Sequence, residues 1–206
     1  MVEQIIPTAT NSPAVNGPPQ GQWTEADWHT LPDDGNRYEI IDGILYMSTA
    51  PSFFHQWIIK QLYRLVGMPA EEQGLAVAIF APVGVFMAGA KPVQPDFLLV
   101  LAANTGIIHD RHIYGVPDFI AEVVSPGSTD YDENIKRKAY ERAGVPEYAV
   151  IDPSARQLRL YQRERSDEGY LSPRIFKGDD VVTLGCLPEI PFHVRDLFSG
   201  SPDTTL

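Results

Sequence analysis

The chain has 206 residues, 44% of them hydrophobic, which is enough for one domain with a sizeable core and short for two. Taken alone, its net charge of −11 argues against binding of nucleic acid, because phosphate binding is driven by Lys and Arg. The apolar stretches fall well short of the roughly 20 residues of a membrane span, and a single cysteine excludes an internal disulfide.

The N-terminal segment has no basic start followed by an apolar block, so it does not resemble a secretory signal. Together with the single cysteine, this predicts a cytoplasmic protein. Residues 1–22 are rich in Pro, Asn, Gln and Thr and show no period, which predicts a flexible tail. We expect a single domain over residues 23–206.

The first elements follow in chain order. Thr24 is a predicted N-cap, with Asp27 three residues later as in a capping box. In RYEIIDGILYMS, two β-type runs flank Asp42-Gly43, which predicts a hairpin. The spacing of apolar residues then predicts a helix over residues 52–67, followed by three strand-like runs that end near residue 101. Residues 102–117 read as loop.

The second half opens with the stretch DFIAEVVS, a predicted buried strand. The helix TDYDENIKRKAYERAG follows, with acidic residues in its first turns and Gly144 at its end. The strand EYAVIDP comes next, and RQLRLYQRE and shorter β pieces complete the chain. The order strand, helix, strand implies a parallel pair with a right-handed crossover, while the hairpin implies antiparallel strands. The sequence therefore predicts an α/β fold with a central mixed sheet flanked by helices.

One residue of the predicted strand 118–125 stands apart. Glu122 lies between two apolar pairs, and a buried carboxylate costs several kcal/mol unless something pairs with it. Asp96 begins another apolar strand, and a strand-borne Asp and Glu with a backbone carbonyl suit a hard cation such as Mg²⁺. Lys136 and Tyr140 are four residues apart on the following helix and share one of its faces.

The order Pro95-Asp96, then Glu122-Val123-Val124, resembles the PD-(D/E)XK nuclease superfamily. More narrowly, the chain is similar to the Uma-type family of restriction endonucleases over roughly residues 23–200. The pieces that carry the likeness are RYEIIDGILY, the helix with His55, VQPDFLLV, EVVSPGSTDYDENIKRKAYERAGVPEYAVIDP and LRLY. The chain departs from the superfamily at Val124, where a lysine is expected, and Lys136 on the next helix takes that role by resemblance.

The resemblance implies a restriction-endonuclease-like core and Mg²⁺-dependent (or Mn²⁺-dependent) hydrolysis of DNA phosphodiesters. Asp96 and Glu122 would hold the metal, with the carbonyl of Val123 as a further ligand, and Lys136 would position or activate the attacking water. Glu39 matches an acidic position near the metal. His55 and Tyr140 are candidate supporting residues. A homodimer is expected, because such nucleases commonly dimerise and the apolar residues of the helix 52–67 exceed what one core buries.

Plainer interpretations exist for each residue. Glu122 can be a structural carboxylate paired with Arg or Lys, Asp96 a turn former, and Lys136 a solvated lysine like Lys138. His55 can be a core or dimer-face histidine, Glu39 an exposed hairpin residue, and Tyr140 a packing residue. The segment 134–177 carries a net charge of +4, which fits either a solvated surface or a patch that faces phosphate.

Two further functions stay open. One is a nuclease-fold module that has lost efficient catalysis and serves in binding or assembly, which the charge of −11 favours. The other is a metal-dependent hydrolase of another phosphoester. His109, His112 and His193 lack metal-ligand spacing and receive no role.

Overall fold

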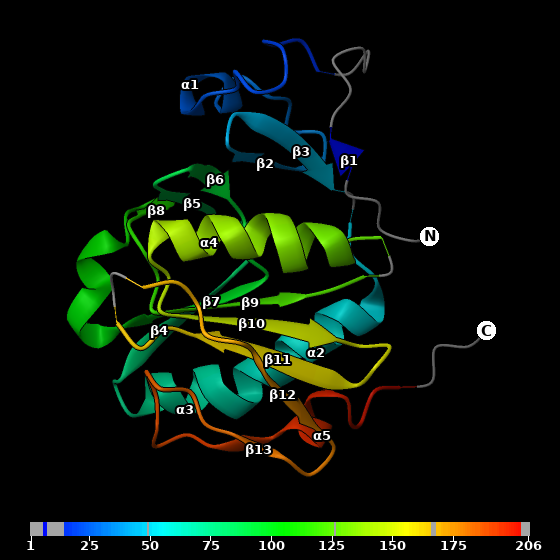
Figure 1. Cartoon of the computed structure of the whole chain (residues 1–206), viewed down its shortest axis with the longest axis vertical. Coiled ribbons are helices and arrows are strands. Elements are labelled where there is room, and N and C mark those ends of the chain that lie inside the picture. The colour runs from blue at the N-terminus through cyan, green and yellow to red at the C-terminus, as the bar shows by residue number, and fades with distance from the viewer. Residues whose placement is uncertain (1–5, 8–14, 49, 126, 166–167, 203–206) are drawn as a thin grey trace.

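The structure, a computed structural model, describes residues 6–7, 15–48, 50–125, 127–165 and 168–202. Two six-stranded mixed sheets lie one above the other in the described part of the chain, with helices between and beside them (Figure 1). The predicted mixed fold class is confirmed. The strands divide into two sheets, however, where the sequence led us to expect one central sheet.

The first sheet has the strand order β1-β3-β2-β6-β5-β8, and its pairs are antiparallel except for β5 with β8. The predicted hairpin is confirmed, because Asp42 and Gly43 join β2 to β3 with positive φ angles of 52° and 75°, as a type I′ turn requires. The strands are β1 (Ile6–Pro7), β2 (Arg37–Ile41), β3 (Ile44–Ser48), β5 (Gly84–Met87), β6 (Ala90–Val93) and β8 (His112–Tyr114).

The second sheet has the order β12-β11-β10-β9-β7-β4. Its neighbours pair antiparallel except β9 and β10, which form the parallel pair expected from the order strand, helix, strand. Its strands are β4 (Ala76–Phe80), β7 (Phe97–Leu101), β9 (Phe119–Val123), β10 (Glu147–Asp152), β11 (Gln157–Gln162) and β12 (Arg174–Lys177). A small pair, β13 (Val181–Val182) with β14 (Phe192–His193), follows near the C-terminus.

The helical elements are short. They are α1 (Glu25–Trp28), α2 (Phe53–Leu62), α3 (Met68–Glu72), α4 (Arg137–Ala143) and α5 (Val194–Leu197), the π-helical segments η1 (Tyr63–Gly67) and η3 (Tyr131–Lys136), and the 3₁₀ helix η2 (Ala102–Ile107). In the described part of the chain, none has the length and apolar character that crossing a bilayer requires.

Helix ends follow the predicted chemistry in part. Thr24 and Asp27 form the capping box of α1, and Ser52 caps α2 through the backbone of His55. The predicted end of the second helix at residue 67 is wrong, because η1 leads directly into α3, which continues to Glu72. The predicted loop 102–117 contains η2 and β8.

The N-terminal residues that the structure describes lie on the first sheet. β1 pairs with β3, Val15 is buried beside that hairpin, and the Gln20 side chain bonds both the N–H and the carbonyl of Leu45. The backbone of residue 21 also donates to the carbonyl of Gly43. The expectation of a flexible tail over residues 1–22 therefore does not hold at residues 15–22, while residues 1–5 and 8–14 lie outside the described part.

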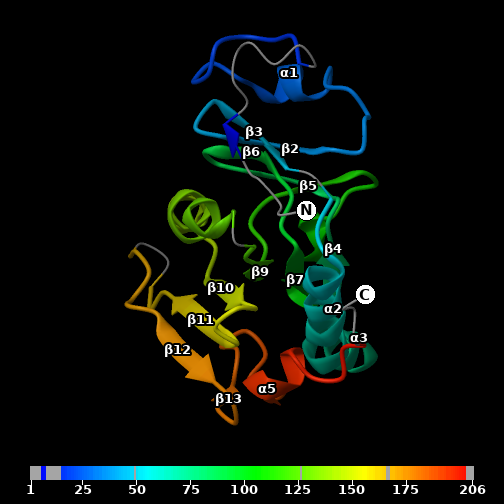
Figure 2. The same ribbon diagram turned by 90° about the vertical axis from the view of Figure 1, so that its right-hand side faces the viewer.

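The second sheet is buried on both faces. Phe97 and Leu99 point to the core under α2, whereas Leu98 and Val100 point to the core under α4 and the first sheet. Figure 2 shows α2 and α4 on opposite sides of this sheet. A polar side chain on the α4 side must therefore find its partners from η3, α4 or the first sheet.

Candidate active site

Two carboxylates come together because β7 pairs with β9. The register sets Phe97 opposite Ala121, so the preceding Asp96 lies opposite Glu122. Both alternate with residues of the α2-side core and therefore point to the α4 side. Two bonds tie them crosswise: the Asp96 N–H donates to Glu122 Oε2 at 3.3 Å, and the Val123 N–H donates to Asp96 Oδ2 at 2.9 Å.

Glu122 has two further partners on the helical segment that covers it. Lys136 Nζ lies 2.9 Å from its Oε1, and the Tyr140 hydroxyl donates to the same oxygen at 2.7 Å. Both come from the face that their four-residue spacing predicts. The buried carboxylate, only 1% exposed, is therefore matched by a cation and hydrogen-bond donors.

The departure from the superfamily motif has a structural account. Val124 faces the same side of the sheet as Glu122, but it belongs to the apolar core there. The amine reaches Glu122 from the opposite wall instead, because η3 and α4 pack over this face and direct Lys136 inward. Lys138, the other candidate, is exposed.

Asp96 is held by two basic side chains from separate elements. Arg37 of β2 places Nη1 3.0 Å from Oδ1, and His55 of α2 places Nε2 3.0 Å from Oδ2. His55 is buried, so it lies in the cluster itself rather than on an exposed face. With the bond from Val123, both oxygens of Asp96 are fixed in orientation.

Glu39 enters from the first sheet. Its Oε1 lies 3.2 Å from Lys136 Nζ and accepts the Gln94 N–H at 2.6 Å, and its Oε2 accepts the Tyr131 hydroxyl at 2.9 Å. Lys136 is thus held between a carboxylate of each sheet. The exposed-hairpin interpretation of Glu39 is wrong, since the residue is 4% exposed.

Sequence reasoning assigned no role to three members of the cluster. Arg37 lies two residues before Glu39, so strand alternation puts both on one face, a signal that could have found it. Asp132 precedes Lys136 by four residues, and its Oδ1 lies 3.9 Å from Nζ. Nothing in the local sequence singles out Tyr131.

The cluster has an excess of acidic groups. Four buried carboxylates face the basic side chains of Arg37, Lys136 and His55, so acidic groups outnumber basic groups whichever protonation state His55 takes. The carboxylates are Glu39, Asp96, Glu122 and Asp132, and the cations are Arg37 and Lys136.

This excess shifts the titration of the acids. Burial, reinforced by the neighbouring carboxylates, raises the pKa of Glu122 well above its ordinary value despite the attraction of Lys136. Burial likewise raises the pKa of Asp132 to about 7. Burial alone would also raise the pKa of Asp96, but the charges of His55 and Arg37 outweigh it and lower that pKa.

Lys136 remains charged in this setting. Burial by itself would lower the pKa of its ammonium, but Glu122, Glu39 and Asp132 together raise that pKa above the ordinary value. A lysine in this state donates hydrogen bonds and offsets negative charge, and it does not accept a proton near neutral pH.

The donor chemistry fits a divalent cation. Asp96 and Glu122 supply carboxylate oxygens from neighbouring strands, and carboxylate oxygen is the ligand type that such an ion prefers. Among the described residues, no group of three or more His, Cys, Asp and Glu side chains is arranged to hold a metal. Two carboxylates completed by backbone oxygen and water, as Mg²⁺ accepts, is the arrangement these residues allow.

The space within the cluster is small. The cavity that these side chains enclose is about 10 Å³, which is close to the room that one water needs. Of the cations on the two strand carboxylates, Arg37 is the most exposed, with 18% of its side chain accessible, against 5% for His55 and 4% for Lys136. Of these three basic side chains, Arg37 therefore lies at the most accessible side of the cluster.

Comparisons with known proteins place the chain by its fold and its family. A solved structure from Anabaena variabilis ATCC 29413, described as a "putative nuclease belonging to DUF820", superposes with a TM-score of 0.72 at 18% identity, covering 85% of this chain and 97% of that one. At that identity the likeness shows a shared fold. None of the curated proteins matches the chain.

The family comparison covers most of the domain. The model of the Uma2 family, described as "Putative restriction endonuclease", matches residues 25–195. That span contains every residue of the cluster, from Arg37 to Tyr140. The chain therefore belongs to the Uma2 family of nuclease-like proteins.

Proposed function

We propose that this protein is a Mg²⁺-dependent endonuclease that hydrolyses DNA phosphodiester bonds. The observation that carries the proposal is the convergence of Asp96, Glu122 and Lys136 from a strand start, a second strand and a helix into one buried cluster. A scaffold has little reason to retain four buried carboxylates, because burying charge costs free energy that apolar residues would not.

Asp96 and Glu122 would hold the metal, with the carbonyl of Val123 as a third protein ligand and Glu39 approaching directly or through water. When bound, Mg²⁺ or Mn²⁺ supplies stabilisation of the negative charge that develops on the phosphate. The crosswise backbone bonds hold both carboxylates in orientation before any ion arrives, which favours binding because little ordering remains to be done.

Lys136 would act on the attacking water as a charged hydrogen-bond donor. Its raised pKa keeps the ammonium protonated, so it orients the water and offsets charge on the reacting phosphate. The reaction consumes one water and yields a phosphomonoester and an alcohol, with a proton passing from the water to the leaving oxygen. His55 and Tyr140 position Asp96 and Glu122 through the bonds described above.

A nicking assay on supercoiled plasmid tests the proposal. With Mg²⁺ or Mn²⁺ the wild-type protein should nick DNA, and EDTA should stop it. Asp96→Ala and Lys136→Met should each lower the rate by about 100-fold or more, the order of loss for one group that stabilises developing charge. The matched control is Lys138→Met, on the same helix but exposed, which should keep full activity. Equal nicking by all four proteins would indicate a contaminating nuclease and contradict the proposal.

A second candidate is a nuclease-fold module that binds or assembles without efficient catalysis. The charge of −11 favours it, and so does the pairing of Asp96 and Glu122 with basic side chains. Calorimetry with Mg²⁺ and Mn²⁺ separates the two candidates. The endonuclease requires binding that Glu122→Gln weakens, whereas absent binding, or binding unchanged in that variant, supports the module.

A further inference from the structure

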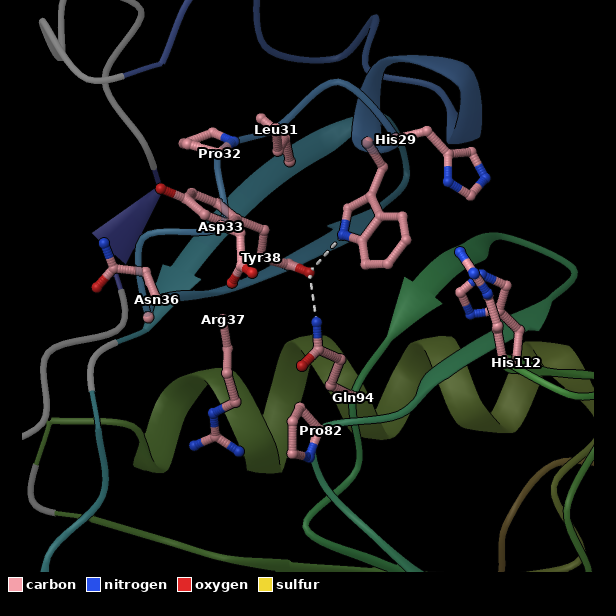
Figure 3. A pocket seen from close by; sticks show the side chains of 13 residues that line it. His29, Leu31, Pro32, Asp33, Asn36, Arg37, Tyr38, Pro82, Gln94 and His112 are labelled. Carbon is pink, nitrogen blue, oxygen red and sulfur yellow. Dashed lines mark hydrogen bonds between the residues drawn. The ribbon is translucent and has the colours of Figure 1, made fainter.

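A pocket of about 470 Å³ opens beside the carboxylate cluster. Its size falls within the range of ligand sites. It lies between α1 and the loop that follows it, the start of β2, and the start of β8 (Figure 3). Arg37 lines both this pocket and the cavity of the cluster, so one guanidinium separates the two spaces.

Aromatic rings form one wall. Trp28, His29 and His112 line the pocket, and each pair of their rings lies with centroids 5.3 to 5.9 Å apart. His29 also stacks on Phe86 behind it, with an interplanar angle of 18°. His29 is exposed, so this wall presents ring surface to whatever enters the pocket. Rings of this kind bind planar bases by stacking.

Gln94 is the second, independent observation. It is 7% exposed and lines the pocket, and its amide nitrogen donates to the carbonyl of Tyr38 at 3.2 Å. That carbonyl can only accept, so the bond fixes which end of the amide is nitrogen. The amide oxygen lies on the side toward Arg37 in Figure 3 and has no hydrogen-bond partner within the described part of the chain. This oxygen is itself shielded from solvent, and a buried acceptor of this kind costs free energy until a donor reaches it.

The charge of the pocket differs from that of the molecule. Arg111 and Arg37, the latter also paired with Asp96, line it together with one acidic residue, Asp33, in a chain whose net charge is −11. The pocket thus combines ring surface, local positive charge and an unmatched acceptor. These are the features that recognise a planar base carrying an amino group, joined to a phosphate.

We propose that this pocket holds the base of a nucleotide next to the phosphodiester that the cluster would cleave, and that it selects bases with an exocyclic amino group. The inference rests on the proposed function for the cleavage step. The base lies against His29, Trp28 and His112, its amino group donates to Gln94 Oε1, and its phosphate is drawn toward Arg37. Adenine, cytosine and guanine carry such an amino group and thymine does not.

Binding of labelled hexanucleotides, followed by fluorescence anisotropy in EDTA, tests this without cleavage. The comparison is dC6 with dT6, two pyrimidines of similar size. We expect dC6 to bind wild-type protein at least about fivefold more tightly than dT6. Gln94→Met keeps the side-chain length and removes the acceptor, so it should abolish that preference. Equal affinity of wild type for the two strands would overturn the assignment of Gln94.

A matched pair of exposed histidines tests the ring wall. His29→Ala should weaken binding of both strands by about fivefold or more, the lower range for loss of one stacking contact. His109→Ala also removes an exposed histidine that contacts a neighbouring ring, but it lies outside the pocket and should change nothing. Equal affinities of the two variants would overturn the pocket proposal. Because both histidines are exposed, their substitution should not disturb folding, so this test can be carried out even if Gln94→Met folds poorly.

The nicking assay keeps this proposal separate from the proposed function. If wild type nicks DNA but the pocket variants bind and cut dC-rich and dT-rich strands as wild type does, the endonuclease stands and the base pocket falls. If the wild-type protein never nicks DNA, yet His29→Ala weakens hexanucleotide binding, the base pocket stands and the protein is a binding module.

Discussion

Lys136 forms ion pairs with carboxylates of both sheets. Its Nζ lies 2.9 Å from a carboxylate of the second sheet, 3.2 Å from one of the first, and 3.9 Å from Asp132 on its own helical segment. Removing one partner of a buried ion pair leaves a charge without compensation, which costs more than the pair contributes. The activity of Lys136→Met therefore has to be compared at equal folded fraction.

The titration of Asp132 gives a prediction for stability. Its pKa is about 7 when folded and 3.8 ordinarily, so between these pH values the folded protein keeps a proton that the unfolded chain has released. The stabilisation from this proton is full below about pH 4 and is lost as the pH rises toward 7. Asp132→Asn resembles the protonated acid and should remove this loss.

The measurement is the free energy of unfolding in urea at pH 4.5, 5.5 and 6.5, in EDTA. The slope of the free energy of unfolding against pH should be more positive in Asp132→Asn than in wild type. The difference should be up to about 1.4 kcal/mol per pH unit, the value for one proton. Asp130→Asn, an exposed site two residues earlier, should keep the wild-type slope. A wild-type slope in Asp132→Asn would contradict the prediction.

Among the individual site residues, the sequence identified those that break a local pattern. Glu122 interrupts an apolar strand, and the following helix offers Lys136 and Tyr140 on one face. Arg37 shares a strand face with Glu39, but its contact with Asp96, 59 residues away in the chain, exists only once the two sheets meet. Gln94 and the pocket rings received no role because each is unremarkable in its own segment.

Among the elements, the helical segment from η3 to α4 has the largest part in the site. η3 carries Lys136 and Asp132, and α4 carries Tyr140 and ends at Gly144, whose φ of 97° lies in the left-handed region. The N–H of Gly144 bonds back to the carbonyls of the last turn, which closes the helix before β10 begins.

Gly144→Ala should lower the free energy of unfolding by about 1–2 kcal/mol, because an L-residue with a Cβ is strained at that φ. The added methyl would contact nothing within 4 Å, so the cost is conformational. Gly106→Ala in η2 also points into open space, without a positive φ, and should change stability little. Urea unfolding measures both, and equal values for the two variants would argue against the strain.

The sequence predicted the elements better than their assembly. The hairpin, the parallel pair and the capped helices follow from local chemistry, namely turn residues, apolar period and caps. The division into two sheets does not, because it depends on which distant strands meet; β2 joins β6 through a single residue pair, Ile41 with Ala90. Residues 15–22 looked like tail because their order comes from contacts with the hairpin.

For the whole molecule, part of the basic segment 134–177 is matched by acidic groups. Arg137, Arg142 and Arg159 each contact a carboxylate of the same protein. This supports a solvated, self-paired surface over a phosphate-facing patch. Affinity for DNA would therefore depend on local features such as Arg37 and Arg111 rather than on overall attraction.

We propose that the molecule forms a homodimer through α2, α3 and the edge strand β4. Phe53 of α2, Met68 of α3 and Phe80 of β4 are 51%, 38% and 38% exposed. β4 is an edge strand of the second sheet, with its Ala78 N–H donating to Glu71. Light scattering after gel filtration should give twice the chain mass. Phe53→Glu should shift it toward the monomer, while Leu171→Glu, at a similarly exposed site far along the chain, should not. A monomeric wild type would contradict the proposal.

The two crosswise bonds among Asp96, Glu122 and Val123 can form only when β7 and β9 pair in their native register. A slip of one residue between β7 and β9 would turn one carboxylate to the α2 core and break both bonds at once. A misaligned chain would then bury an unmatched charge in an apolar layer and could not persist as a compact state. The same carboxylates that would serve catalysis thus also enforce fidelity during folding, because only the native alignment gives them partners.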